Sequence, residues 1–174
     1  MWRGNIMQLK EYHHILVPVD GSKATEAVVA QAAVMAKAHH ANLELLNVVQ
    51  VAQFSDGIIS GISLDKDQTY NLINQANERL QDLKKELEAT GVEKVGVHVR
   101  FGNPKQVIAH DFVEDHQIDL IVMGATGLSA VERMVVGSVT QYATRNADAD
   151  VLVVKINKDD FKVKSSSDEP IVGL

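Results

Sequence analysis

The sequence predicts an α/β fold, a doubly wound parallel sheet with helices on both faces. Short apolar runs alternate along the chain with longer segments of helical periodicity. Three of these runs are apolar almost throughout, which is typical of parallel strands covered on both sides. The length of 174 residues, of which 45% are hydrophobic, suits one domain with one core.

Five apolar runs are expected to form the strands. They are residues 14–19, 43–49, 95–100, 119–124 and 151–155. The first, fourth and fifth are the runs that are apolar almost throughout. Because a helical segment separates each strand from the next, the crossovers are expected to be right-handed and the strands parallel.

The first two helices are predicted from side-chain spacing. In the first, Ser22 is expected to be the cap, because apolar residues follow it at helical intervals from Ala24 to Met35. In the second, apolar residues repeat every three or four positions from Ile73 to Leu87. This helix is expected to end before Gly91.

The last two helices are predicted from their first residues. The third opens with Asn103 as its cap and Pro104 at the first helical position, and Gln106 is expected to close a capping box. The fourth is expected to begin near Ser138. The predicted domain covers residues 13–156, between an N-terminal extension (1–12) and a flexible C-terminal tail (157–174).

Composition excludes several classes of function. There is no cysteine, which fits a reducing compartment, and the first residues lack the apolar core of a signal peptide. No apolar run approaches the ~20 residues of a membrane span. The net charge of −6 argues against nucleic-acid binding. A cytoplasmic protein is predicted, with neither nucleic acid nor membrane as its partner.

Two long connections locate the expected site. They cover about 50–66 and about 125–137, and both leave the carboxyl ends of strands. In open α/β sheets ligands bind at that edge. The first loop is expected to close over a ligand bound beside it.

Glycines at the end of the fourth strand suggest which ligand binds. Gly124 leaves room beside the strand, and Gly127 can turn the chain so that its amides point inward. Gly137 and Ser138 then begin a helix, whose first N–H groups and dipole attract anions. Together they predict a phosphate cradle, although turn glycines followed by a helix cap would give the same pattern. Neither a Walker A loop nor a dinucleotide fingerprint is present.

The same residues resemble a known family. Gly124-Ala125-Thr126-Gly127, nine residues and Gly137-Ser138 resemble the G-x-x-G, nine residues, G-[ST] pattern of nucleotide-binding universal stress proteins. "ILVPVDGS", "LLNVV" and "FGNP" resemble the family's first strand with its aspartate, its second strand and the turn before its third helix. The resemblance covers about 13–156. It implies a Rossmann-like sheet of order 3-2-1-4-5, often in a dimer.

The resemblance also implies which residues contact the ligand. On the nucleoside side they are Asp20, Val48, Met123 and Gly124. On the phosphate side, amides and a hydroxyl are implied from Gly127, Gly137, Ser138 and Val139. The alternatives are that Asp20 caps the first helix and that Val48 and Met123 are ordinary core residues.

Three functions stay open from the sequence. The first is a stress-response sensor or regulator that binds ATP or a related adenine nucleotide, with Mg²⁺ as a candidate companion, and that forms a homodimer through Val151–Lys155. The second is an interaction protein that acts through its dimer surface without nucleotide. The third is a slow ATPase. No catalytic residue is predicted, because no base is evident beside Ser138, and the histidines lack metal-ligand spacing.

Overall fold

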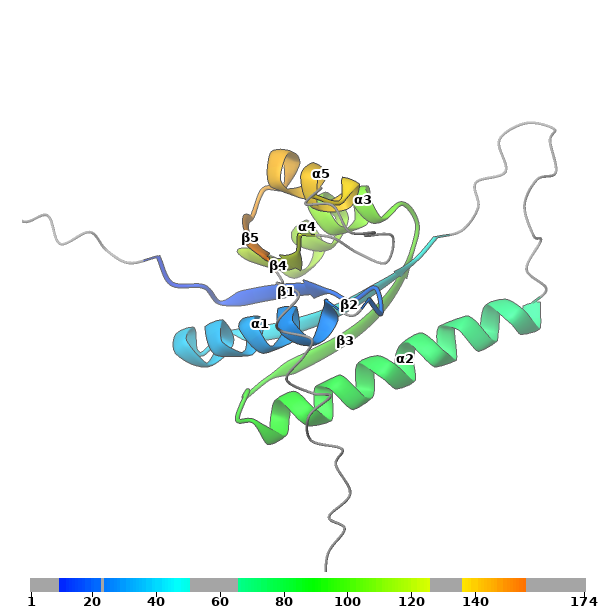
Figure 1. The fold of residues 1–174 in the computed structure, drawn as a ribbon, viewed down its shortest axis with the longest axis horizontal. Helices are drawn as coiled ribbons and strands as arrows, with labels where there is room; N and C mark the ends of the chain where they lie inside the picture. Colours follow the sequence, from blue (N-terminus) through cyan, green and yellow to red (C-terminus); the bar gives the residue numbers. More distant parts are fainter. Residues whose placement is uncertain (1–9, 23, 51–65, 126–135, 156–174) are drawn as a thin grey trace, which may run out of the picture.

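The computed structural model describes residues 10–22, 24–50, 66–125 and 136–155, with the backbone alone for 66–69. Its five strands form one parallel sheet of order β3-β2-β1-β4-β5 (Figure 1), which confirms the predicted fold class and strand order. The strands are β1 (His14–Pro18), β2 (Asn42–Val49), β3 (Val95–Phe101), β4 (Leu120–Gly124) and β5 (Asp150–Val154). Each end lies within one residue of the predicted range.

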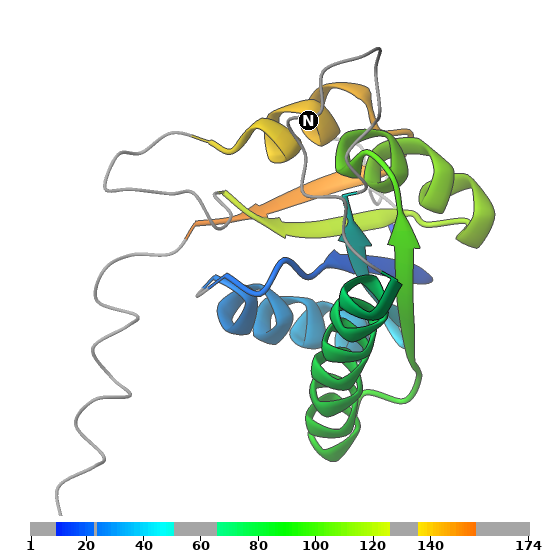
Figure 2. The ribbon, with the colours of Figure 1, turned by 90° about the vertical axis from the view of Figure 1, so that its right-hand side faces the viewer.

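Helices cover both faces of the sheet (Figure 2). On one face lie α1 (Thr25–His39) and α2 (Lys66–Ala89). The opposite face carries α3 (Pro104–Gln106), the π-helical turn η1 (Val107–Asp111), α4 (Phe112–His116) and α5 (Ser138–Asn146). The first three of these follow one another without a break, and we call them the 104–116 helical run.

The central strand β1 shows why some strands of this sheet are apolar almost throughout. Ile15, Leu16 and Val17 are all fully buried. Ile15 and Val17 belong to the core cluster shared with α1 and α2, whereas Leu16 belongs to the cluster shared with η1, α4 and α5. Successive side chains of one strand therefore enter two different cores.

The predicted cap of the first helix is wrong. α1 begins at Thr25, and Ala24 stands at its cap position without a side-chain hydrogen bond. Ser22 lies in a turn before the helix, because its amide donates to Asp20 Oδ1 at 2.9 Å and its carbonyl accepts from the Thr25 amide at 3.1 Å. The end of α2 is as predicted: Gly91 follows it with a φ of 93°.

The start of the third helix is partly as predicted. Asn103 accepts a hydrogen bond from the Lys105 amide at 3.0 Å, and Pro104 is the first helical residue. The predicted capping box is wrong, because the Asn103 amide makes no hydrogen bond to the Gln106 side chain among the described residues. Gln106 Nε2 donates to Asp111 Oδ1 at 3.0 Å. The π-helical turn lies between these two residues and brings their side chains together. α5 begins at Ser138, as predicted.

Several sequence predictions fall outside the described residues. They include the tail (157–174), most of both long loops and most of the N-terminal extension. Of that extension, Lys10 and Tyr12 are described, and their side chains bond Asp150 at 2.6 Å and 2.9 Å. Within the described part of the chain, no helix has both the length and the apolar character needed to cross a membrane.

Candidate functional site

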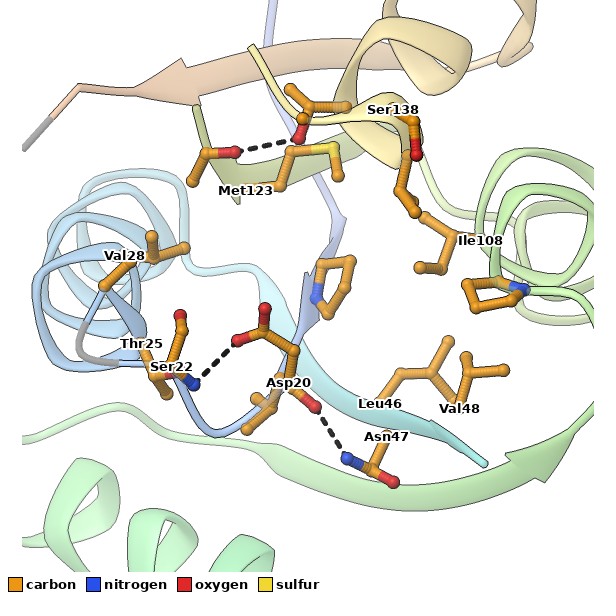
Figure 3. A pocket seen from close by; sticks show the side chains of 18 of the residues that line it. Asp20, Ser22, Thr25, Val28, Leu46, Asn47, Val48, Ile108, Met123 and Ser138 are labelled. Carbon is orange, nitrogen blue, oxygen red and sulfur yellow. Dashed lines mark hydrogen bonds between the residues drawn. The ribbon is translucent and has the colours of Figure 1, made fainter. Parts of the chain in front are cut away.

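A cavity of about 400 Å³ lies where the strand order reverses, at the carboxyl ends of β1 and β4 (Figure 3). This volume falls in the range of small-molecule sites, about 300–1,000 Å³. Its walls come from the strand ends, the starts of α1 and α5, and the 104–116 helical run. The cavity therefore occupies the place where the topology of an open α/β sheet leaves a crevice.

Seven of the eight sequence-predicted site residues line this cavity. They are Asp20, Val48, Met123, Gly124, Gly137, Ser138 and Val139. The eighth, Gly127, lies outside the described residues. The fold thus brings together residues as far apart in the chain as Asp20 and Val139. Their contact with a nucleotide stays a prediction.

The floor of the cavity is apolar. Leu46 and Val48 from β2, Ile108 from η1 and Met123 from β4 converge on it (Figure 3). Met123 is 5% exposed and belongs to the core cluster of that face, against which Val48 also packs. Val48 and Met123 are therefore core residues and cavity residues at once. A flat apolar group such as a nucleobase suits such a floor.

Asp20 lines the cavity two residues after the end of β1. Its Oδ1 accepts from the Ser22 amide at 2.9 Å, which fixes the direction of the carboxylate (Figure 3). Because α1 starts only at Thr25, Asp20 does not cap this helix. No donor in the described part of the chain bonds Oδ2. The carboxylate can therefore still accept a hydrogen bond from a ligand hydroxyl or amine.

The start of α5 supplies donors to the opposite wall. The helix's hydrogen-bond ladder begins with the Gln141 amide donating to the Gly137 carbonyl at 2.9 Å, so Ser138, Val139 and Thr140 have N–H groups without an intrahelical acceptor. The Gly137 amide is already used, since it donates to the Ala125 carbonyl at 2.7 Å. Gly137 thus offers close approach, and the amides after it offer the hydrogen bonds.

Two polar residues that sequence reasoning missed hold these walls in place. The Thr140 side chain is 4% exposed, and its hydroxyl donates to the Gly124 carbonyl at 2.9 Å. Asn47 Nδ2 donates to the Val19 carbonyl at 2.7 Å and so positions the chain between β1 and Asp20. A polar residue inside the apolar run "LLNVV" was the available signal for Asn47. For Thr140 the signal was its place in the first turn after Gly137.

The charge around the cavity is simple. Among the described lining residues Asp20 is the one ionisable side chain, and neither lysine nor arginine occurs there. An anion at this wall would rely on backbone N–H groups and the positive end of the α5 dipole. The described residues hold no cluster of three or more histidines or carboxylates suited to a metal ion.

A Rossmann-like parallel sheet with a small-molecule cavity at its switch point defines the class of protein. The sequence model of the universal stress protein family matches residues 11–155, and the chain belongs to that family. A Staphylococcus saprophyticus protein assigned to the same family is 34% identical over 160 residues, which cover 91% of this chain and 93% of the relative.

Solved structures resemble the fold over most of the chain. Universal stress protein UspA from Lactobacillus plantarum superposes with a TM-score of 0.71 at 33% identity, covering 84% of this chain and 99% of that one. A universal stress protein in complex with cAMP superposes with a TM-score of 0.62 at 25% identity, covering 83% and 98%. That complex concerns the other protein, and it motivates a test of nucleotides here.

Proposed function

We propose that this protein binds an adenine nucleotide, ATP or a close relative, in the switch-point cavity and acts as a ligand-responsive regulator in a stress response. The observation that carries the proposal is the convergence on one cavity of seven residues that the family resemblance implies as ligand contacts. The cAMP complex of a similar family member supports the same ligand class. The absence of cysteine from the sequence supports a cytoplasmic place of action.

In this proposal the nucleoside and the phosphate occupy different walls. The base lies on the apolar floor, with its edge at the backbone of Val48, and the ribose lies near Asp20 and Gly124. The phosphate takes the amides of Ser138 and Val139, where the helix dipole favours negative charge. A companion Mg²⁺ would bind phosphate oxygens, with Asp20 as the nearest described carboxylate in the lining.

Calorimetric titration with ATP, AMP and cAMP tests the proposal, together with mass spectrometry of ligand retained by the purified protein. Asp20→Asn keeps the shape of the side chain but removes its charge, so affinity is expected to fall about tenfold, or ~1.4 kcal/mol. Asp82→Asn is the matched control, because Asp82 lies on α2 with its side chain 72% exposed. If the wild type binds none of the three ligands, the proposed nucleotide binding is wrong. If Asp20→Asn and Asp82→Asn bind them equally well, the role assigned to Asp20 is wrong.

We extend the proposal to a homodimer formed through the β5 edge at Val151–Lys155. β5 is the last strand of the sheet, so one side of its backbone has no partner strand among the described residues. Val153→Lys on this strand is expected to give a monomer in light scattering, because an edge lysine opposes pairing. Val34→Lys on α1, where Val34 is 57% exposed, is the control. A wild-type monomer at high concentration would refute the dimer.

The alternative is an interaction protein that uses this dimer surface and no nucleotide. It predicts that ATP, AMP and cAMP leave the melting temperature of the protein unchanged. A slow ATPase, the third reading, predicts phosphate release from bound ATP that Asp20→Asn reduces.

A further inference from the structure

A cluster of ionisable side chains lies on the sheet face that carries α4, outside the cavity lining. Its members, which we call the histidine cluster, are Glu44 on β2, His98 and Arg100 on β3, and Asp115 and His116 on α4. Two of them are largely withdrawn from water, with the Glu44 side chain 15% exposed and that of His98 26% exposed. A positive charge on His14 of β1 also lowers the pKa of Glu44.

Glu44 and His98 form the centre of the cluster. His98 Nε2 lies 2.8 Å from Glu44 Oε2, and since a carboxylate only accepts, His98 is the donor. This hydrogen bond holds the pKa of Glu44 below its ordinary value. Gly96 pairs with Glu44 across β2 and β3, and a Cβ at Gly96 would overlap the Glu44 carboxylate. The strand therefore carries a glycine where the carboxylate needs space.

The neighbours of His116 favour its neutral form. Its Nε2 lies 3.4 Å from Arg100 Nη2, and a guanidinium has donors alone, so His116 Nε2 must accept. The ring also stacks on Phe112 at a centroid distance of 3.9 Å and meets the His98 ring edge-on at 4.6 Å. Burial is the largest cause of the lowered pKa of His116, followed by the charge of His98. Arg100 adds a smaller lowering effect, and Glu44 and Asp115 act in the opposite direction.

One helical segment joins this cluster to the cavity. His116 ends the 104–116 helical run, and near its other end Pro104 and Ile108 line the cavity. Phe112, under the His116 ring, shares a core cluster with Ile108. The Phe112 amide also donates to the Val107 carbonyl across the π-helical turn. A shift at His116 thus reaches the cavity wall through packed side chains and a continuous backbone.

We propose that the histidine cluster is an acid sensor in which protonation of His116 moves the 104–116 helical run and lowers the affinity of the cavity for its ligand. A protonated Nε2 would point an N–H at the Arg100 donors, so the ring must leave this position. Arg100 keeps a partner, since its Nη2 also lies 3.2 Å from Asp115 Oδ2. The ligand part of the proposal rests on the proposed function.

The sign of the response follows from the protonation of the folded and unfolded chains. The ordinary pKa of histidine is near 6.5, and the pKa of His116 in the folded chain is lower. Below pH 6.5 the unfolded chain therefore binds a proton at this residue more readily than the folded chain does, so the stability of the fold decreases as pH falls. The lowered pKa of Glu44 adds a second loss below its ordinary value of 4.5. By linkage, a ligand that favours the neutral state lowers the proton affinity of His116.

Nuclear magnetic resonance tests the sensor without any ligand. In a titration from about pH 7.5 to about pH 5, the His116 ring is expected to titrate below the ordinary value, and the amides of Lys105 and Ile108 to shift with the same midpoint. His116→Asn removes these amide shifts. His40→Asn retains them, because His40 is 78% exposed and paired with Glu93. The wild-type titration is sufficient to overturn the proposal. It does so if the His116 ring titrates at the ordinary histidine value, or if the amide shifts of Lys105 and Ile108 have a different midpoint from the ring.

Titration with cAMP then tests the link to the cavity. The single phosphodiester of cAMP stays ionised over this pH range. A change in affinity with pH therefore arises from protonation of the protein and not of the ligand. Wild type is expected to bind about fivefold more weakly at about pH 5.5 than at about pH 7.5, and His116→Asn equally at both. Equal wild-type affinities overturn the link. If neither cAMP nor ATP binds at any pH, the proposed function fails, and the amide shifts still decide whether the sensor exists.

Discussion

The switch-point cavity presents mainly backbone groups and apolar side chains, whereas the histidine cluster consists of charged and polar side chains. Asp20 is the one ionisable residue in the described lining of the cavity. In the cluster, residues from β2, β3 and α4 bond one another across strand faces. Apart from Asp20, a site of the first kind should tolerate changes that keep its space free. A site of the second kind depends on each side chain and on pH.

The largest difference is expected from filling the cavity. Gly137 has a φ of −61° and a ψ of 151°, which threonine adopts readily at a helix cap. Gly137→Thr should therefore leave the fold intact while its side chain takes ligand space. We expect nucleotide affinity to fall about 30-fold, or ~2 kcal/mol, in calorimetry. Val136→Thr, one residue earlier and outside the cavity lining, is the control, and equal losses in both variants would contradict the assigned wall.

The cluster should respond to a much smaller group. Gly96→Ala places a Cβ against the Glu44 carboxylate, so we expect unfolding in urea to show a loss of about 2 kcal/mol. In a Glu44→Ala background the same change should cost much less, which a double-mutant cycle measures. Additive effects would mean that Gly96 and Glu44 do not share this space. Nucleotide affinity at neutral pH is expected to change little.

Acid should weaken the histidine cluster through Glu44. The hydrogen bond from His98 lowers the pKa of Glu44, so this carboxylate stabilises the fold above its ordinary value of 4.5, and the contribution is lost as pH falls below it. Glu44→Gln should make the unfolding midpoint less dependent on pH in that acid range. The same slope in wild type and Glu44→Gln would show that other carboxylates dominate.

The smallest effect is expected at the exposed ion pair of Lys10 and Asp150. Their side chains are 58% and 50% exposed although the Nζ–Oδ2 distance is 2.6 Å. Water and salt screen such a pair, so Lys10→Met should not change the melting temperature measurably. A decrease in melting temperature larger than that caused by Gly96→Ala would contradict the expectation that buried contacts stabilise the fold more than exposed ones.

Local sequence was sufficient for much of the fold and for the cavity. The apolar runs located all five strands. Three of them are apolar almost throughout, as expected for parallel strands buried on both faces. Glycines and helix starts follow one another closely in the chain, so their grouping at a strand end was visible. In both wrong cap assignments the predicted residue makes other hydrogen bonds, Ser22 through its backbone and Gln106 through its side chain. Asp20 drew Ser22 into a turn, and a π-helical turn brought Asp111 to Gln106.

The histidine cluster could not be predicted in this way. His98 and His116 lie on a strand and a helix, and their approach depends on how α4 packs on β3. Glu44 meets Gly96 because the register of β2 and β3 pairs them. Spacing along the chain carries neither fact. His110, which precedes His116 on the same helical run, lies outside the cluster, with its Nε2 3.3 Å from the Tyr142 hydroxyl.

The central position of β1 affects synthesis as well as structure. A ribosome releases β1, β2 and β3 first, and these can pair as one half of the sheet. The other side of β1 then stays open until β4 emerges, although Ile15 and Leu16 are fully buried in the finished protein. Nascent chains in which Phe101 has just left the ribosome should therefore bind chaperones through this apolar edge. Chains in which Val154 has also left the ribosome should not. The strand at the centre of the sheet thus begins to pair early and gains its second neighbour only when β4 emerges.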